Sequence, residues 1–304
     1  MKMIRCVCVA AGIAATGALW ACDVAAARAV QVAEPYVDVP FDTATGGLVL
    51  VQVTLNGGER GWWVLDSGAS VCVVDVALAE RRGLRRAGSG SVSGAGAGRV
   101  AADTVEPVQV EIGGQATECE RTVAIDLAGL KDPLGRRIDG ILGFDFMRRH
   151  VVEIDYAARR LRLHDPRTYR YAGTGRRVPL RFRDRLPYVV AHITVGDEPP
   201  VERTLLVDTG SGDAVDDSLL LQSPRPTRKV TGGVGLGSTY QVTLGFLDAV
   251  EIGGFRFEDV PAVAPGPSLV GGAVLRRFTV ILDYSRQEMI LAPNRHLAAP
   301  WGVN

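Results

Sequence analysis

An internal repeat limits how this chain can fold more than any other feature. Residues 140–163, GILGFDFMRRHVVEIDYAARRLRL, align without a gap with residues 268–291, SLVGGAVLRRFTVILDYSRQEMIL. Both copies contain an apolar pair and a glycine, then Arg-Arg, an apolar segment, Asp-Tyr, a short turn and a second apolar segment. A shorter repeated segment lies before each copy: VQVEIGG at 108–114 before the first, and DAVEIGG at 248–254 before the second. Ordered repeats of this kind predict two halves built on one plan.

Both halves have the character of β-structure. Short segments rich in valine and isoleucine, bounded by Gly, Asn, Asp or Arg, indicate strands at 48–55, 61–66, 108–112, 151–156 and 160–163. Helix signals are few: apolar spacing predicts one helix within 73–84, and residues 216–222 are its counterpart. We therefore expect an all-β fold of two homologous, β-barrel-like lobes with a few short helices, an N-terminal lobe at 30–166 and a C-terminal lobe at 167–304.

The first 29 residues predict a secretory signal peptide. Lys2 and Arg5 precede an uncharged run of about 17 residues, and Ala-Arg-Ala at 27–29 forms a cleavage site. One alternative is an uncleaved membrane anchor, but the run is marginal for spanning a bilayer. Another is lipid attachment at Cys22, where LWAC loosely resembles a bacterial lipoprotein box. Cleavage after Ala29 is favoured, which predicts an exported protein, periplasmic or extracellular, with no membrane span after cleavage.

Cysteines, histidines and charge narrow the possible partners. Signal cleavage leaves Cys72 and Cys119, which could form one disulfide in an oxidising compartment. Their spacing matches no metal signature and the four histidines are scattered, so we expect neither a metal nor another cofactor. The formal net charge is zero, with no long run of Lys or Arg, which argues against nucleic acid as a partner.

An aspartate follows an apolar strand in each half. WWVLDSGAS at 62–70 places Asp66 before Ser-Gly, and RTLLVDTGSG at 203–212 places Asp208 before Thr-Gly. Either motif alone is consistent with an ordinary turn, because Asp and Ser bond their own backbone and Gly adopts positive φ. The two motifs, however, hold equivalent positions in the duplicated halves. A pseudo-twofold axis between the lobes would bring them together.

Two carboxyls held close in a sheltered cleft cannot both ionise cheaply, so they share one proton. The ionised group can then deprotonate a water that attacks a carbonyl carbon, while the protonated group polarises the carbonyl oxygen. This chemistry requires neither a nucleophilic side chain nor a metal ion. It suits a sequence in which no Ser-His arrangement or metal-ligand pattern is found.

The pattern apolar-apolar-Asp-[Ser/Thr]-Gly, followed in each half by an apolar pair and a glycine, resembles the aspartic proteases. The duplication within one chain is similar to the pepsin-like enzymes, and the compact lobes are similar to the retroviral-type proteases and their bacterial relatives. The resemblance covers most of the predicted mature chain. It implies an active-site cleft between the lobes, with Asp66 and Asp208 as the catalytic dyad.

The resemblance also implies roles for neighbouring residues. The hydroxyls of Ser67 and Thr209 would brace the two active-site loops, and Gly68 and Gly210 would permit close approach of the backbone. Each half has a glycine-rich segment where the family has hairpins, at 87–98 and 231–240. The first would be a flap over the substrate, or merely a surface loop; its candidate substrate-binding residues are Gly94, Gly96 and Gly98.

One difference between the two motifs bears on acidity. The residue after Asp-Ser-Gly is Ala69, whereas the residue after Asp-Thr-Gly is Ser211. A hydroxyl at position 211 could bond the Asp208 carboxylate and favour its ionised form. We therefore expect Asp66 to have the higher pKa and activity to be optimal at a less acidic pH than pepsin's.

The function predicted from the sequence is that of an exported aspartic endopeptidase, a monomer acting on peptide or protein substrates. The alternative is a catalytically silent module that binds extended peptides by strand addition. Retention of both acids favours the enzyme. The first glycine-rich segment contains no aromatic residue, whereas pepsin-type flaps usually present a tyrosine, and this favours the silent module.

Overall fold

The structure is a computed structural model that describes residues 36–94, 98–232, 237 and 239–302. The predicted signal peptide at 1–29 lies outside the described residues. The described residues all belong to one compact unit. Strands account for 51% of the structure and helices for 11%, so the expected all-β fold is confirmed.

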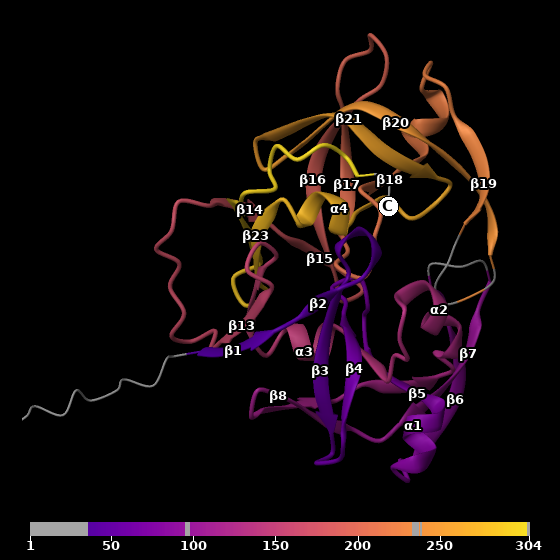
Figure 1. The fold of residues 1–304 in the computed structure, drawn as a ribbon, viewed down its shortest axis with the longest axis vertical. Helices are drawn as coiled ribbons and strands as arrows, with labels where there is room; N and C mark the ends of the chain where they lie inside the picture. Colours follow the sequence, from indigo (N-terminus) through magenta and orange to yellow (C-terminus); the bar gives the residue numbers. More distant parts are fainter. Residues whose placement is uncertain (1–35, 95–97, 233–236, 238, 303–304) are drawn as a thin grey trace, which may run out of the picture. The chain divides into compact units, whose positions relative to one another are not determined.

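The first half of the unit forms a ten-stranded sheet (Figure 1). Its strands are β2 (Asp42–Thr43), β3 (Val49–Leu55), β4 (Arg60–Leu65), β5 (Cys72–Asp75), β6 (Arg86–Val92), β7 (Val100–Val105), β8 (Val108–Ile112), β9 (Gln115–Cys119), β10 (Thr122–Ile125) and β11 (Gly140–Leu142). They pair in the order β6-β7-β10-β5-β11-β4-β3-β8-β9, with β2 on β3. The short helices are η1 (Thr45–Gly47), α1 (Val76–Arg81), η2 (Ala128–Leu130), α2 (Lys131–Leu134) and α3 (Phe144–Met147).

The second half forms an eight-stranded sheet in the order β15-β16-β17-β22-β18-β21-β20-β19. Its strands are β15 (Arg181–Arg183), β16 (Leu186–Thr194), β17 (Val201–Val207), β18 (Val215–Asp216), β19 (Arg228–Gly232), β20 (Tyr240–Ile252), β21 (Phe255–Ala264) and β22 (Leu269–Val270), and its short helices are η3 (Ser218–Gln222) and α4 (Gly272–Leu275). In both sheets a short central strand, β11 or β22, runs parallel to the strand before the acid and antiparallel to the strand after it. The two halves therefore share one plan, as the repeat predicted.

A third sheet of six strands is built from both halves. Its order is β1 (Tyr36–Pro40), β13 (Arg160–His164), β12 (Val151–Asp155), β23 (Phe278–Asp283), β24 (Glu288–Pro293) and β14 (Arg176–Pro179). The central pair β12–β23 is antiparallel and places Glu153 opposite Ile281, which hold equivalent positions in the repeat. A pseudo-twofold axis therefore passes between these two strands. The predicted lobe boundary at 166/167 falls between β13 and β14 and stays a prediction.

The predicted helix within 73–84 was partly wrong. Val73 and Val74 belong to β5, where these β-branched residues pair with β10 on one side and β11 on the other. The helix α1 begins at Val76, and the Asp75 carboxylate accepts the N–H of Leu78 at 3.2 Å as its N-cap. The predicted counterpart at 216–222 is the 3-10 helix η3, capped in the same way by Asp217.

Two further features concern the core and the chain's relation to membranes. Cys72 on β5 and Cys119 at the end of β9 are fully buried and joined in a disulfide with Cα atoms 6.2 Å apart. The bond links two strands that are not neighbours in the sheet. Within the part of the chain that the structure describes, no helix combines the length and apolar character needed to cross a bilayer.

Candidate active site

The two sequence-predicted acids each lie directly after a strand of equivalent position. Asp66 follows β4, and its N–H donates to the carbonyl of Leu142 at the end of β11, at 3.0 Å. Asp208 follows β17, and its N–H donates to the carbonyl of Val270 at the end of β22, also at 3.0 Å. The apolar residues before each acid are buried in these parallel pairings, while both carboxyls are half-buried. Each strand thus leads out of the core and ends in a carboxylate.

The residues after the acids hold the two loops together by reciprocal hydrogen bonds. The N–H of Ser67 donates to the Thr209 hydroxyl at 2.9 Å, and the N–H of Thr209 donates to the Ser67 hydroxyl at 3.0 Å. Each hydroxyl then donates across the axis to a backbone carbonyl: Ser67 to Val207 at 2.6 Å and Thr209 to Leu65 at 2.8 Å. Four buried hydrogen bonds therefore join the two acid loops.

Glycine at the next position brings each loop against the other acid. The N–H of Gly68 donates to the Asp66 carboxylate at 2.7 Å, and the N–H of Gly210 donates to the Asp208 carboxylate at 2.8 Å. A Cβ atom on Gly68 would lie 2.6 Å from the carboxyl carbon of Asp208, and one on Gly210 would lie 2.6 Å from a carboxyl oxygen of Asp66. The two carboxyls can approach one another because neither glycine has a side chain.

Burial raises the pKa of both acids. For Asp66, desolvation is the main cause and the charge of Asp208 is the second, and together they raise its pKa well above the usual range. Desolvation also raises the pKa of Asp208, but the N–H of Gly210 and a hydrogen bond from Asp66 work against the rise. That hydrogen bond favours the proton on Asp66 and the negative charge on Asp208. The arrangement is one in which two carboxyls share a proton.

Residues 51–146 match the family model described as aspartyl protease. This segment belongs to the aspartyl proteases. The match includes the Asp66 loop, and Asp208 lies beyond it, related to Asp66 by the duplicated fold. The search of curated proteins found no match.

The predicted hydrogen bond between the Ser211 hydroxyl and the Asp208 carboxylate is not found among the described residues. The Ser211 hydroxyl accepts the N–H of Asp213 at 3.2 Å. It is the backbone of Ser211 that lowers the pKa of Asp208, as the backbone of Ala69 lowers that of Asp66. The expected order of acidity thus rests on the hydrogen bond between the acids instead of on this hydroxyl.

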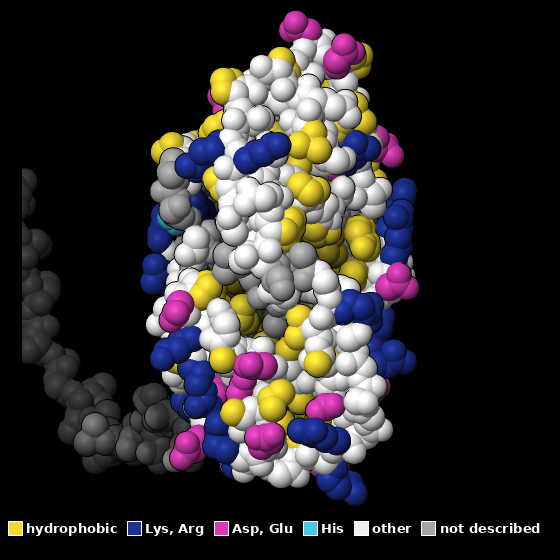
Figure 2. Space-filling model, turned by 90° about the vertical axis from the view of Figure 1, so that its right-hand side faces the viewer, with side chains coloured by type: hydrophobic (Ala, Val, Ile, Leu, Met, Phe, Trp, Pro, Cys, Tyr) yellow, Lys and Arg dark blue, Asp and Glu magenta, His cyan; other side chains and the backbone are white. Residues whose placement is uncertain are grey.

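The predicted flap is part of the hairpin formed by β6 and β7. Gly94 and Gly98 lie beyond the ends of these strands and are exposed, while Gly96 lies outside the described residues. The Arg99 guanidinium donates to the Ser91 hydroxyl at 2.6 Å, which ties the two strands near the tip. Figure 2 views the side of the protein that carries β6, β7 and β19, where hydrophobic side chains gather in recesses near mid-height.

Sequence reasoning missed a third carboxyl beside the dyad. Asp216 on β18 is only 8% exposed, and its Oδ1 atom has no hydrogen-bond partner among the described residues. Burial, followed by the charges of Asp213 and Asp208, raises the pKa of Asp216 to about 9. In the first half the equivalent strand position is the apolar Val73. The signal in the sequence was an acid within the apolar stretch AVDDSLLL.

Metal ligation was not expected, and the described residues contain no group of three or more His, Cys, Asp or Glu side chains arranged to hold a metal ion.

Proposed function

We propose that the protein is an active aspartic endopeptidase that hydrolyses peptide bonds with water activated between Asp66 and Asp208. The observation that carries the proposal is the set of four hydrogen bonds through Ser67 and Thr209, which holds the two acid loops face to face. The aspartyl protease family match of residues 51–146 supports the same chemistry. Groups fixed in this way need little reorganisation during reaction.

The reaction follows from the unequal protonation of the pair. Asp208 as carboxylate removes a proton from water while the water oxygen bonds to the peptide carbonyl carbon. Asp66 donates its proton to the carbonyl oxygen, which gives a tetrahedral diol. The C–N bond then breaks as Asp208 delivers its proton to the amide nitrogen. One hydroxyl of the diol returns its proton to Asp66 and becomes the new carboxyl carbonyl, which restores the starting state.

The substrate proposed for this site is an extended peptide or an unfolded protein segment. The hairpin β6–β7 on one half and the hairpin β19–β20 on the other supply candidate walls for such a chain. A peptide bound between them would have its scissile bond at the dyad. We propose a monomer, since both halves of the pseudo-twofold site lie in one chain.

Export is proposed from the signal-like segment at 1–29, with anchoring through Cys22 as the less favoured form. The buried disulfide between Cys72 and Cys119 supports an oxidising compartment, because such bonds are rare where thiols are kept reduced. We therefore propose a periplasmic or extracellular location.

The alternative function is a silent peptide-binding module on the same fold. No hydroxyl or aromatic group of the β6–β7 hairpin is bonded to the dyad among the described residues, which leaves the flap without the tyrosine usual in pepsin-type enzymes. Intact acids and intact bracing hydrogen bonds favour the enzyme.

Cleavage of an unfolded protein by the purified chain, from pH 3 to pH 8, tests the proposal. Asp66→Asn and Asp208→Asn keep the shape of each side chain but remove its role in proton transfer. Fragments from the parent and none from either variant would support the shared dyad. Folded parent that binds a peptide at every pH without cutting it would establish the silent module instead.

A further inference from the structure

A cavity of about 520 Å³ has neither Asp66 nor Asp208 among its lining residues, and the charged residues that line it are all of one sign. It is bordered by η1, by the turn that follows β12, by the end of α4 and by residues 295–300. Its basic residues are Arg159, Arg276, Arg277, Arg295 and His296, and no Asp or Glu is among the described residues that line it.

One arginine of the cavity wall, Arg277, is buried without a counter-charge. Arg277 is 4% exposed; it donates to the carbonyls of Leu297 and Ala299, both at 2.7 Å, and stacks on Trp301 at 3.7 Å. No described carboxylate pairs with it, and its Nε atom has no described partner. Burial, followed by repulsion from Arg276, lowers the pKa of Arg277. A buried, unpaired charge is costly and is normally compensated by a partner.

Two other groups of the cavity wall also have no described polar or charged partner for the side-chain head. Tyr156 is 6% exposed, and its hydroxyl has no described hydrogen-bond partner. The stem of Arg276 packs against the backbone of Gly47, and no described acid pairs with its guanidinium. The cavity therefore combines two adjacent arginines with a buried hydroxyl donor.

The equivalent arginine pair in the first half of the fold is neutralised by carboxylates of the protein itself. Arg148 and Arg149 are the repeat equivalents of Arg276 and Arg277. Arg148 pairs with the fully buried Asp145 three residues earlier and with Glu120, and Arg149 also pairs with Glu120. The residue equivalent to Asp145 in the second half is Ala273. The second copy has thus lost a carboxylate and kept both positive charges.

A second difference between the copies lies next to this one. Phe144 in the first half packs against Tyr284, with ring centroids 5.8 Å apart, and against Phe182. Its equivalent in the second half is Gly272, where an added Cβ would lie 2.6 Å from the carbonyl oxygen of Gly46 and 3.0 Å from that of Ser211. The helix η1, which borders the cavity, therefore packs where a side chain would otherwise stand. Loss of the ring and loss of the acid occur at adjacent positions.

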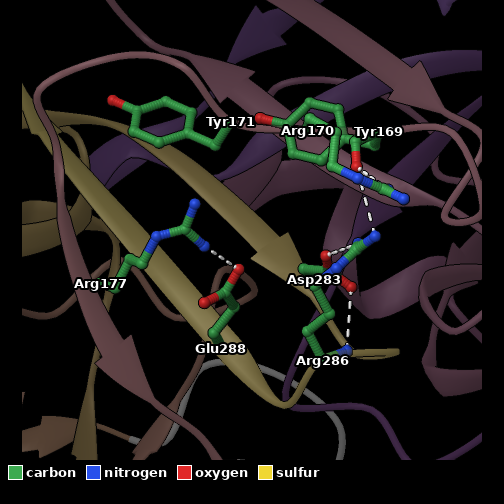
Figure 3. A pocket seen from close by; sticks show the side chains of 7 residues that line it. All are labelled: Tyr169, Arg170, Tyr171, Arg177, Asp283, Arg286 and Glu288. Carbon is green, nitrogen blue, oxygen red and sulfur yellow. Dashed lines mark hydrogen bonds and ion pairs between the residues drawn. The ribbon is translucent and has the colours of Figure 1, made fainter.

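A smaller cavity of about 40 Å³ provides a contrast (Figure 3). It also has arginines on its wall, but Arg177 pairs with Glu288 and Arg286 pairs with Asp283. The third, Arg170, donates to the carbonyl of Tyr169 at 2.6 Å. Its positive charge is largely balanced within the protein, so it has no comparable need for an anion.

We propose that the large cavity binds an oxyanion carrying two or more negative charges, of the size of a phosphate or diphosphate group. Arg276 and Arg277 would supply the main charge-assisted hydrogen bonds, since guanidinium groups match the oxygens of phosphate and carboxylate. The Tyr156 hydroxyl would donate a further hydrogen bond, and Arg159 and Arg295 would contribute at the more exposed side. The bound oxyanion would take the electrostatic role that Asp145 has in the first half.

Titration calorimetry on the purified 304-residue chain tests this site without any use of proteolytic activity. Inorganic phosphate, pyrophosphate and citrate would be titrated at pH 7, each at an ionic strength held constant with NaCl. We expect one binding event per chain and a rise in Tm with anion concentration, because a ligand that binds the folded state stabilises it. Stronger binding of citrate than of the phosphates would support an oxyanion site whose natural occupant is a carboxylate.

Three variants make the test specific. Arg276→Gln removes one cationic contact and should weaken binding about tenfold or more. Ala273→Asp restores the acid of the first half three residues before Arg276, and should weaken binding while preserving the fold. Arg228→Gln removes an exposed arginine of β19 outside the cavity and is the matched control.

The proposal would be overturned by absence of heat and of any Tm shift with all three anions. It would also be overturned if Arg228→Gln weakened binding as much as Arg276→Gln, which would indicate general electrostatic attraction. Unchanged affinity in folded Ala273→Asp protein would have the same consequence.

Discussion

Ser67 and Thr209 each accept the other's backbone N–H through a side-chain hydroxyl, at 3.0 and 2.9 Å. Both hydroxyls are buried and also donate to a carbonyl of the opposite half. Removing one hydroxyl leaves a buried N–H and a buried carbonyl unpaired. The pair should therefore matter to stability and to the position of the acids.

Thr209→Ala is expected to lower the free energy of unfolding by about 1–3 kcal/mol, the cost of unsatisfied buried groups, and to reduce kcat strongly. Thr209→Ser keeps the hydroxyl and should retain most of the stability and activity. Urea denaturation and peptide cleavage measure the two effects. Equal behaviour of the Ala and Ser variants would show that the methyl group, not the hydroxyl, matters at this position.

Gly210→Ala is expected to abolish cleavage, because the added Cβ would overlap the Asp66 carboxyl group. Gly129→Ala is the matched control, since its Cβ would meet no atom within 4 Å. Specific activity of both variants on one peptide is the measurement. Full activity of Gly210→Ala would mean that the two acid loops are less closely apposed than described.

The pH dependence of cleavage should reflect the raised pKa values of the dyad. The active dyad carries one proton, and raising both pKa values moves the range of that form to higher pH. We therefore expect kcat/KM to follow a bell-shaped profile with an optimum less acidic than pepsin's. A pH–rate profile with its maximum near pH 2 would contradict the assignment.

Asp216→Asn should stabilise the protein at neutral pH. Below the ordinary pKa of 3.8 the Asp216 carboxyl is neutral in both states and costs nothing. From there up to about 9 the folded state retains a proton that the unfolded state has lost, so stability falls as pH rises. Asparagine avoids that loss, which is on the order of 4 kcal/mol at pH 7. Urea denaturation at pH 4 and pH 7 should show a gain only at the higher pH; the same gain at both would point to packing instead of charge.

The disulfide between Cys72 and Cys119 should contribute substantially to stability. Its closure spans 47 residues, which corresponds to about 4 kcal/mol of chain entropy in the unfolded state. We expect the Cys72→Ala/Cys119→Ala double variant to unfold at a markedly lower urea concentration than the parent. Reduction of the parent should have a similar effect, whereas the double variant should not respond to reductant.

The fold and the pairing of the acids could be predicted because each depends on a pattern that occurs twice. The copies at 140–163 and 268–291 indicated a pseudo-twofold arrangement, and β12 and β23 pair about its axis. Asp66 and Asp208 each follow an apolar strand at equivalent positions of the two halves, so the same pseudo-twofold arrangement predicted that they form one site. The predicted helix at 73–84 began too early. Val73 and Val74 fit the apolar spacing of a helix as well as that of a strand, and in the structure they form a strand because they pair with β10 and β11.

What could not be predicted depends on differences between the copies. The stretch AVDDSLLL places an acid among apolar residues, but it does not show that Asp216 is buried, because burial depends on which neighbours the strand acquires. The cavity at Arg276 and Arg277 was equally hidden. In the sequence these two arginines look the same as Arg148 and Arg149, and only the contacts show that one pair has carboxylate partners and the other has none.

The pairing of Glu153 with Ile281 also determines when the candidate site can be completed during synthesis of the chain. The strand β12 has no neighbour on its β23 side until the ribosome has made the chain as far as Phe278–Asp283. The loop that carries Asp66 likewise cannot form its hydrogen bond to Thr209 until that residue has been made. A nascent chain that contains only the first acid therefore lacks both the second acid and the strand that orders it. Synthesis in one direction would thus delay the proposed proteolytic activity until most of the fold has been translated.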